Sequence, residues 1–218
     1  MMATKVALVT AGSAGLGAAI ARTLAHEARM RVVINYSSNE TRAKALIQDL
    51  EAREGAGDDK VKHFAAIKAD MSQRDEIRRL VKETVDSMGR LDVVISNAGW
   101  TKMRTFMDLD DGVDEGDWDR CFNVNVKSHL WLFHAARPYL DQSEGAFIST
   151  ASVAGVKPSG SSLPYAVTKA ALIHLTKSLA VIAAPRIRVN SVSPGVLLTD
   201  WGLSFPKNGL MLSKSRTD

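Results

Sequence analysis

The stretch "KVALVTAGSAGLG", Lys5 to Gly17, decides the fold of this chain. Its first half is an apolar run typical of a buried strand, and from Gly15 onward apolar side chains recur at helical spacing. Glycines at positions 12, 15 and 17 crowd the point where the strand should end and the helix begin. Glycines there let the N–H groups of a helix N-terminus approach a phosphate closely. The stretch is either a phosphate-binding turn or a glycine-rich connector.

Short apolar segments alternate with segments of helical period along the rest of the chain. We expect strands at 5–10, 31–36, 63–70, 91–99, 145–152 and 187–195, and helices at 41–53, 77–88, 118–140 and 165–184. Strands that are apolar throughout, each followed by a helix, require a parallel sheet covered on both faces. The chain is therefore predicted to be α/β, a doubly wound parallel sheet (Rossmann fold) of about six strands, in one domain over 1–218.

Composition adds limits on partners and location. Apolar residues make up 45% and charged residues 24% of the chain, and the net charge of +4 is scattered, so no basic stripe predicts a nucleic-acid partner. The single cysteine, Cys121, cannot form an internal disulfide and fits a reducing compartment. The first strand leaves no room for a signal peptide, and the apolar run 170–185 is interrupted by His174 and Lys177. These features predict a cytoplasmic protein without a membrane segment.

Tyr165 and Lys169, in "YAVTK", lie four residues apart and should share one face of a helix. An ordinary tyrosine, with a pKa of about 10, is poorly matched to proton transfer at neutral pH. An ammonium close by favours the phenolate, so Lys169 is expected to lower the pKa of Tyr165. The alternative is a solvated helix face, because this spacing is common by chance.

The glycine turn resembles that of the short-chain dehydrogenase/reductase family. Thr10, Gly15 and Gly17 are in register with the family pattern T-G-x-x-x-G-x-G. The family's first glycine is replaced by Ala11, which would be strained if that position requires a positive φ. The neighbouring Gly12 is expected to absorb this change.

Further matches complete a catalytic tetrad of the classical type in this family. Ser152 precedes Tyr165 by thirteen residues, as the family serine does, and Asn125 in "NVNVK" matches the family asparagine. The resemblance implies that Tyr165 is the general acid in reduction and the base in oxidation, while Ser152 hydrogen-bonds the substrate oxygen. It also implies that Lys169 binds the nicotinamide ribose and that Asn125 holds a water molecule linking Lys169 to solvent. The implied function is hydride transfer between NAD(P) and a carbonyl group or secondary alcohol.

The same resemblance supplies the cofactor-binding residues. They are Thr10, Gly12, Ser13, Gly15, Leu16, Gly17, Tyr36, Ser37, Ser38, Asp70, Asn97, Ala98, Gly99, Tyr165, Lys169, Pro194, Gly195 and Thr199. In this fold, an acidic residue after the second strand binds the ribose hydroxyls and would repel a 2′-phosphate. Here the strand ends in "NYSSN", without an acid and with Arg42 close by, so NADP is predicted rather than NAD. A polar turn with a helix cap fits these residues too, and Asp70 could equally be a helix cap.

No metal site is expected. The acidic run 108–119 fails the calcium-loop pattern, because Gly112 stands where an oxygen ligand is needed and no Glu closes the loop. We interpret it as a solvated loop before a helix, and we expect Cys121 and His129 to pack in the core. The expected substrate is a small carbonyl compound or alcohol, with a bulky or aromatic one favoured by the apolar residues that flank the site: Trp100, Met103, Phe106, Trp201 and Phe205.

Family members normally continue beyond this chain's last residues through a substrate-covering helix and a final strand. We therefore expect residues 202–218 to be a remnant of the substrate lid, with the usual last strand missing. Two functions remain open: an active NADP-dependent reductase or alcohol dehydrogenase, and a truncated, catalytically weak nucleotide-binding or regulatory protein. A homo-oligomer, in the simplest case a dimer through the helices 118–140 and 165–184, is expected with either function.

Overall fold

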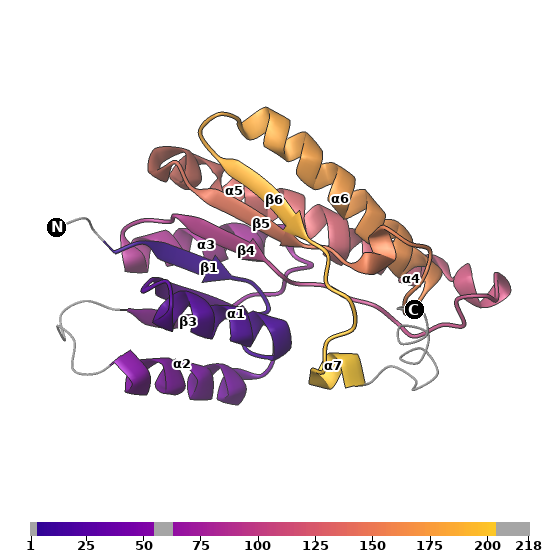
Figure 1. Ribbon diagram of the computed structural model, residues 1–218, viewed down its shortest axis with the longest axis horizontal. Coiled ribbons are helices and arrows are strands. Elements are labelled where there is room, and N and C mark those ends of the chain that lie inside the picture. Colours follow the sequence, from indigo (N-terminus) through magenta and orange to yellow (C-terminus); the bar gives the residue numbers. More distant parts are fainter. Residues whose placement is uncertain (1–3, 55–62, 204–218) are drawn as a thin grey trace, which may run out of the picture.

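The computed structural model describes residues 4–54 and 63–203, whose strands form one sheet between two layers of helices (Figure 1). The strands are β1 (Val6–Val9), β2 (Arg31–Tyr36), β3 (Phe64–Lys68), β4 (Val93–Ser96), β5 (Ala146–Thr150) and β6 (Arg188–Val192). Their order is β3-β2-β1-β4-β5-β6, and every neighbouring pair is parallel. The predicted doubly wound sheet is confirmed. Its strand order reverses between β1 and β4, where this fold binds its ligands.

The helices divide between the two faces of the sheet (Figure 1). One apolar layer joins the sheet to α1 (Gly15–His26) and α2 (Glu40–Glu54). The other joins it to α3 (Arg74–Met88), α5 (Ser128–Ser143) and α6 (Leu163–Ala183). Because β1 and β4 are buried on both faces, they read as continuous apolar runs rather than as alternating ones.

The predicted helix 118–140 differs from the observed one in length and regularity. It begins earlier, as α4 (Glu115–Phe122), and Asp114 caps it by accepting the N–H of Asp117 at 2.9 Å. A π-helical segment, η2 (Asn123–Lys127), then leads into α5. A π-turn carries one residue more than an α-turn, and such segments are frequent at functional sites.

The helix α6 meets the length and hydropathy requirements of a membrane span, which we did not expect from the run 170–185. It carries three buried polar side chains in its first half, those of Tyr165, Thr168 and Lys169. It packs against β6 and the π-helical segment. In this fold α6 lies against the sheet with one face in the core, while Val181 and Ile182 near its C-terminus stay exposed.

The strand β6 forms one edge of the sheet among the described residues. Arg188, Asn190 and Val192 are exposed along it and alternate with more buried neighbours, the pattern of a strand covered on one face. Two short 3-10 helices, η1 (Asp110–Gly112) and η3 (Val153–Gly155), and the short helix α7 (Asp200–Leu203) complete the structure. Phe205 and most of the expected lid remnant lie outside the described residues.

Candidate active site

Close backbone approach shapes the turn between β1 and α1. A Cβ atom on Gly17 would lie 2.3 Å from the carbonyl oxygen of Ala11, and one on Gly12 would lie 2.8 Å from Cβ of Ile34. Gly12 and Gly17 are therefore needed for space. The positive φ angles of the turn fall on Ala11 (47°) and Gly15 (50°), so Gly12 does not absorb the replacement of the family glycine. The strain stays on Ala11.

The N-terminus of α1 has the features of an anion site. Its N-cap residue, Ala14, offers no side-chain acceptor, and no acidic side chain lies in the first turn. The first N–H groups of a helix lack partners within the helix, so those at Gly15–Gly17 suit a phosphate. Thr199, from the segment after β6, lies against Gly15, with 3.4 Å between its Cβ and a Cβ built on the glycine. Residues far apart in the sequence thus meet at this turn, beside the half-buried Ser13 and Leu16.

Asn35, which the sequence analysis missed, fixes the turn to the neighbouring strands. Its buried Oδ1 accepts the N–H of Ala11 at 3.1 Å, and its Nδ2 donates to the carbonyl of Ala69 at 2.9 Å. Its backbone carbonyl accepts the N–H of Gly12 at 2.9 Å. The signal was an amide inside the otherwise apolar strand "VVINY", where a buried polar group needs specific partners.

Thr10 and His129 hold the segment after β4 from opposite sides. The hydroxyl of Thr10 accepts the N–H groups of Asn97 and Ala98 at 2.8 and 3.1 Å. Thr10 is fully buried, so its structural role is to position this segment. On the other side, His129 Nε2 lies 3.1 Å from the carbonyl oxygen of Ala98, and Nδ1 lies 2.7 Å from the hydroxyl of Ser96.

These partners fix the tautomer of His129. The carbonyl of Ala98 can only accept, so Nε2 carries the proton, and Ser96 donates its hydroxyl hydrogen to Nδ1. Burial and the nearby Lys169 lower the pKa of His129 to about 3, which keeps the ring neutral. As expected, His129 and Cys121 are fully buried, and burial raises the pKa of the Cys121 thiol to about 11.

Ser152, Tyr165 and Lys169 form a buried cluster at the carboxyl end of β5. A side-chain hydrogen bond joins Ser152 to the phenol of Tyr165. The ammonium of Lys169 lies 5.6 Å from the centre of the Tyr165 ring and donates to the carbonyl of Thr150 at 2.8 Å. Lys169 is thus placed against both the tyrosine and the end of the strand.

The expected lowering of the tyrosine pKa is wrong for this structure. Burial raises the pKa of Tyr165 above its ordinary value, and only the hydrogen bond from Ser152 opposes this effect. Burial also lowers the pKa of Lys169 to about 8. Both changes have the same origin, because a low-dielectric site disfavours whichever form is charged.

Asn125 lies next to this cluster, inside the π-helical segment. Its Oδ1 accepts the N–H of Trp100 at 2.7 Å, and its Nδ2 donates to the carbonyl of Trp100 at 2.9 Å and to the hydroxyl of Thr168 at 3.0 Å. A Cβ atom on Gly99 would lie 3.6 Å from both Asn125 Oδ1 and Lys169 Nζ. Two residues of the predicted tetrad, Asn125 and Lys169, therefore lie beside the end of the segment 97–99.

The residues expected to bind the adenosine differ in their burial. Tyr36 is buried in the apolar layer beneath α2, whereas Ser37 and Ser38 are exposed. Asp70 is also exposed, and its carboxylate accepts the N–H of Ser72 at 2.8 Å. Asp70 is not the cap of α3, since the N-cap position belongs to Gln73.

The segment after β6 reaches the site through its backbone. The carbonyl of Pro194 accepts the N–H of Val153 at 3.0 Å, next to Ser152, and open space surrounds the Cβ position of Gly195. The buried hydroxyl of Thr150, whose carbonyl holds Lys169, has no hydrogen-bond partner among the described residues. With the uncapped helix α1, this unpaired hydroxyl fits a polar dinucleotide bound along the strand ends.

Among the described residues, no group of three or more His, Cys, Asp or Glu side chains is arranged to hold a metal ion. Trp100 and Phe106 instead pack around a small apolar cluster that includes Tyr165 and Cys121. Met103 is exposed nearby in the sequence. The site thus combines buried polar groups with an apolar surround.

Residues 5–208 match the family model for short chain dehydrogenases. The chain is 37% identical over 202 residues to the 3-oxoacyl-[acyl-carrier-protein] reductase of Staphylococcus aureus, covering 92% of this chain and 77% of that protein. A short chain dehydrogenase from Burkholderia cenocepacia, solved in complex with NADP, is similar with a TM-score of 0.79 and 36% identity, covering 90% of this chain and 76% of that one. A 3-ketoacyl-(acyl-carrier-protein) reductase from Brucella melitensis, solved with NADH, has a TM-score of 0.80 at 25% identity, covering 93% and 80%.

Proposed function

Because this chain belongs to the short-chain dehydrogenase/reductase family, a family of oxidoreductases, we propose that it transfers a hydride between NADP and a carbonyl group or secondary alcohol. The observation that carries this proposal is the buried cluster of Ser152, Tyr165 and Lys169 at the carboxyl end of β5. The two segments that supply it, at β5 and α6, meet where a doubly wound sheet binds its ligands.

In reduction, Tyr165 is the proton donor to the substrate oxygen. The phenol is protonated at neutral pH and so has a proton to donate, but burial raises its pKa and makes it a weaker acid than an ordinary tyrosine, so the charge left on its oxygen needs stabilisation by neighbouring groups. Ser152 orients the substrate oxygen and stabilises the negative charge that develops on it. Lys169, whose ammonium faces the ring of Tyr165, stabilises the phenolate that remains after the proton has left. The nicotinamide, when bound, supplies or accepts the hydride.

The chain's own groups would hold the dinucleotide along the strand ends. The N–H groups at Gly15–Gly17 would bind the pyrophosphate, and Lys169 together with the unpaired hydroxyl of Thr150 would face the nicotinamide side. The segment 97–99 would lie between the pyrophosphate site and the nicotinamide site, and Thr10 and His129 would hold it in place.

The preference for NADP rests on the end of β2. No carboxylate lies between the end of this strand and Asn39, and Ser37, Ser38 and Arg42 are exposed there, while Glu40 at the start of α2 is paired with Lys44. Hydroxyl and guanidinium groups donate to a phosphate, whereas an acid would repel it. The similarity to the Burkholderia protein bound to NADP supports this choice, while the Brucella protein was solved with NADH.

We propose a small carbonyl compound with an apolar body as the substrate, because Trp100 and Phe106 pack around the cluster that contains Tyr165. A cytoplasmic location is proposed from the single, buried cysteine. Neither proposal depends on the residues beyond position 203.

The test is turnover by the purified protein with NADPH and a panel of aliphatic ketones, aromatic ketones and 3-oxoacyl thioesters. We expect oxidation of NADPH with at least one class, and a loss of about 10²-fold or more in Tyr165→Phe, since general acid catalysis contributes about 10²–10⁴-fold. Tyr139→Phe, on α5, is the matched control and should keep full activity. NADPH binding without turnover would favour the catalytically weak nucleotide-binding protein, and an active Tyr165→Phe variant would contradict the mechanism.

A further inference from the structure

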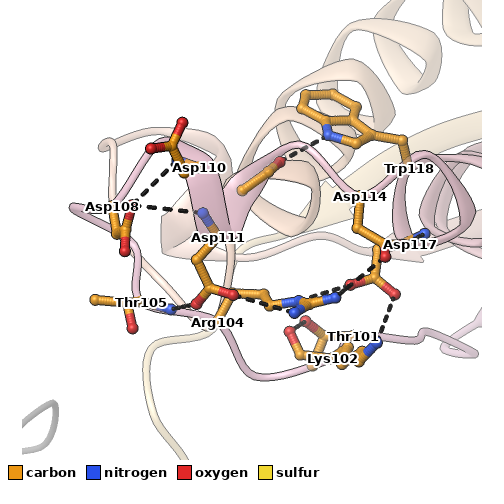
Figure 2. Close-up of polar contacts among 11 residues, drawn as sticks. Thr101, Lys102, Arg104, Thr105, Asp108, Asp110, Asp111, Asp114, Asp117 and Trp118 are labelled. Atoms are coloured by element: carbon orange, nitrogen blue, oxygen red, sulfur yellow. Dashed lines mark hydrogen bonds and ion pairs between the residues drawn. The ribbon is translucent and has the colours of Figure 1, made fainter.

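The segment between β4 and α4 is organised around one arginine, Arg104 (Figure 2). Its Nε and Nη2 lie 2.8 and 2.7 Å from the same carboxylate oxygen of Asp117. Its Nη1 lies 3.1 Å from Asp111, and Nη2 also lies 3.5 Å from Asp114. Lys102 reaches the other oxygen of Asp117 at 3.4 Å. We call these five side chains the Arg104 cluster.

The Arg104 cluster fixes a segment that has little secondary structure of its own. Between β4 and α4, only the three residues of η1 are regular. The carboxylate of Asp111 accepts the N–H of Thr105 at 2.6 Å, and Asp114 caps α4. Asp117 is 7% exposed, so its charge depends on the cations beside it. Without Arg104, three carboxylates would face each other with one lysine between them.

A short chain of hydrogen bonds connects this cluster to the catalytic helix. The backbone N–H of Arg104 donates to the carbonyl of Ser161 at 2.9 Å. The hydroxyl of Thr101 lies 2.7 Å from that of Ser161 and 3.3 Å from that of Ser162. Ser162 is the N-cap of α6, and its hydroxyl accepts the N–H of Tyr165 at 3.3 Å. These bonds attach the segment 101–104 to the first turn of α6, so a shift of the segment would move that turn.

An apolar contact runs parallel to this polar one. Phe106, two residues beyond Arg104, packs against the small cluster formed by Cys121, Ala154, Tyr165 and Ala166. Arg104 itself contacts neither the tyrosine ring nor the strand ends in any bond that the structure gives it. Its effect on Tyr165 has to pass through the segment that it holds.

From this geometry we infer that Arg104 is a positioning residue that sets the N-terminal turn of α6, and with it the orientation of Tyr165; the inference rests on the proposed oxidoreductase function. A reaction that needs near-attack geometry is sensitive to such placement, since an error of about 1 Å can cost about 10²-fold in rate. Lysine at this position would keep one charge but could not bridge three carboxylates as the planar guanidinium does.

The experiment compares Arg104→Gln and Arg104→Lys with a matched control, Arg90→Gln. Arg90 also pairs with a buried aspartate, Asp92, at 2.8 Å from Nε to Oδ2. Arg90 precedes β4 and therefore lies at the amino ends of the strands, whereas the proposed site lies at their carboxyl ends. We expect Arg104→Gln to lower kcat by about 10- to 100-fold at an unchanged KM for NADPH. Arg104→Lys should recover part of the loss, and Arg90→Gln should keep the kcat of the natural protein.

Hydrogen exchange at the backbone amides of Tyr165 and Ala166, which both donate to Ser162, supplies a readout that needs no turnover. Exchange should be faster in Arg104→Gln and unchanged in Arg90→Gln. Thr101→Val removes the hydroxyl contact to Ser161 and leaves the side chains of the Arg104 cluster in place. It should also speed exchange at the first turn of α6. If Arg104→Gln does not fold, Thr101→Val tests whether the segment 101–104 positions that turn. Unchanged exchange and unchanged kcat in Arg104→Gln or Thr101→Val would overturn the inference. Absence of turnover in the natural protein would instead refute the proposed function, while the exchange rates still decide the role of Arg104.

Discussion

At the scale of single residues, the spacing of residues in the sequence predicted which side chains meet, but it did not predict how deeply they are buried. The distance of four residues between Tyr165 and Lys169 correctly predicted that they would meet on one helix face. Spacing could not reveal that both side chains are buried, and burial reverses the expected direction of the tyrosine pKa. The missed role of Asn35 has the same cause, because its partners come from the ends of two other strands.

Ala11 provides a prediction about backbone strain. It holds a φ of 47° where the family has glycine, and a side chain disfavours this conformation by roughly 1–2 kcal/mol. We expect Ala11→Gly to raise the free energy of unfolding by up to about 1 kcal/mol, because glycine also gains freedom in the unfolded chain. Urea denaturation measures this change. Ala19→Gly, at an exposed position in the interior of α1, should lower stability by a similar amount, and a loss of stability in Ala11→Gly would contradict the prediction.

His129 predicts how stability depends on pH. Its pKa of about 3 in the folded protein lies below the ordinary value of 6.5, so between these values the unfolded chain binds a proton that the folded chain does not. Stability should therefore fall as the pH decreases below 6.5, by up to about 1.4 kcal/mol per pH unit from this group. Urea midpoints between pH 7 and 5 test this in the natural protein and in His129→Gln, where the decrease should be smaller. His174→Gln, an exposed control on α6, should leave the slope unchanged; an equal slope in His129→Gln would refute the assignment.

At the scale of elements, the sequence predicted the six strands and the helices α1, α2, α3 and α6 within a few residues, because turn chemistry marks their ends. It predicted α4 and α5 as one helix, and it did not predict α7. Gly89 ends α3 as expected, with a φ of 77° at the C-cap. The π-helical segment could not be predicted, since the apolar pattern continues through it. It places Asn125 against the backbone of Trp100, a contact that only the tertiary structure supplies.

Asn125→Ala tests whether those bonds hold the segment after β4. The N–H and carbonyl of Trp100 would lose their partners near a fully buried position, and each unsatisfied buried group costs about 1–3 kcal/mol. We expect a loss of roughly 2–4 kcal/mol in unfolding free energy, measured by urea denaturation. Asn123→Ala is the matched control within the same π-helical segment, because among the described residues the side chain of Asn123 makes one hydrogen bond, to the carbonyl of Ser72. Equal losses in the two variants would show that the segment, and not the bonds of Asn125, is responsible.

At the scale of the whole molecule, topology explains why a reading of the sequence could assemble the site. In a parallel sheet, all carboxyl ends lie along one edge, so motifs that follow different strands must meet there. Gly15, Gly99, Ser152 and Thr199 follow β1, β4, β5 and β6, and the structure brings them to that edge. The sequence does not reveal which helix faces stay exposed, because this depends on contacts between segments far apart in the chain and on contacts with other chains.

The exposed apolar side chains of α5 and α6 predict that the protein is a homodimer. Val181 is 81% and Ile182 58% exposed, and Val167 and Leu130 are exposed on the same two helices. Val181 and Ile182 are adjacent on α6, and burying each such side chain in an interface is worth about 1.5–3 kcal/mol. Sizing chromatography with light scattering should give a dimer for the natural protein and a monomer for the double variant Val181→Glu, Ile182→Glu. Met107→Glu, at an exposed position outside these helices, should remain a dimer, and a natural protein that is monomeric at micromolar concentration would refute the prediction.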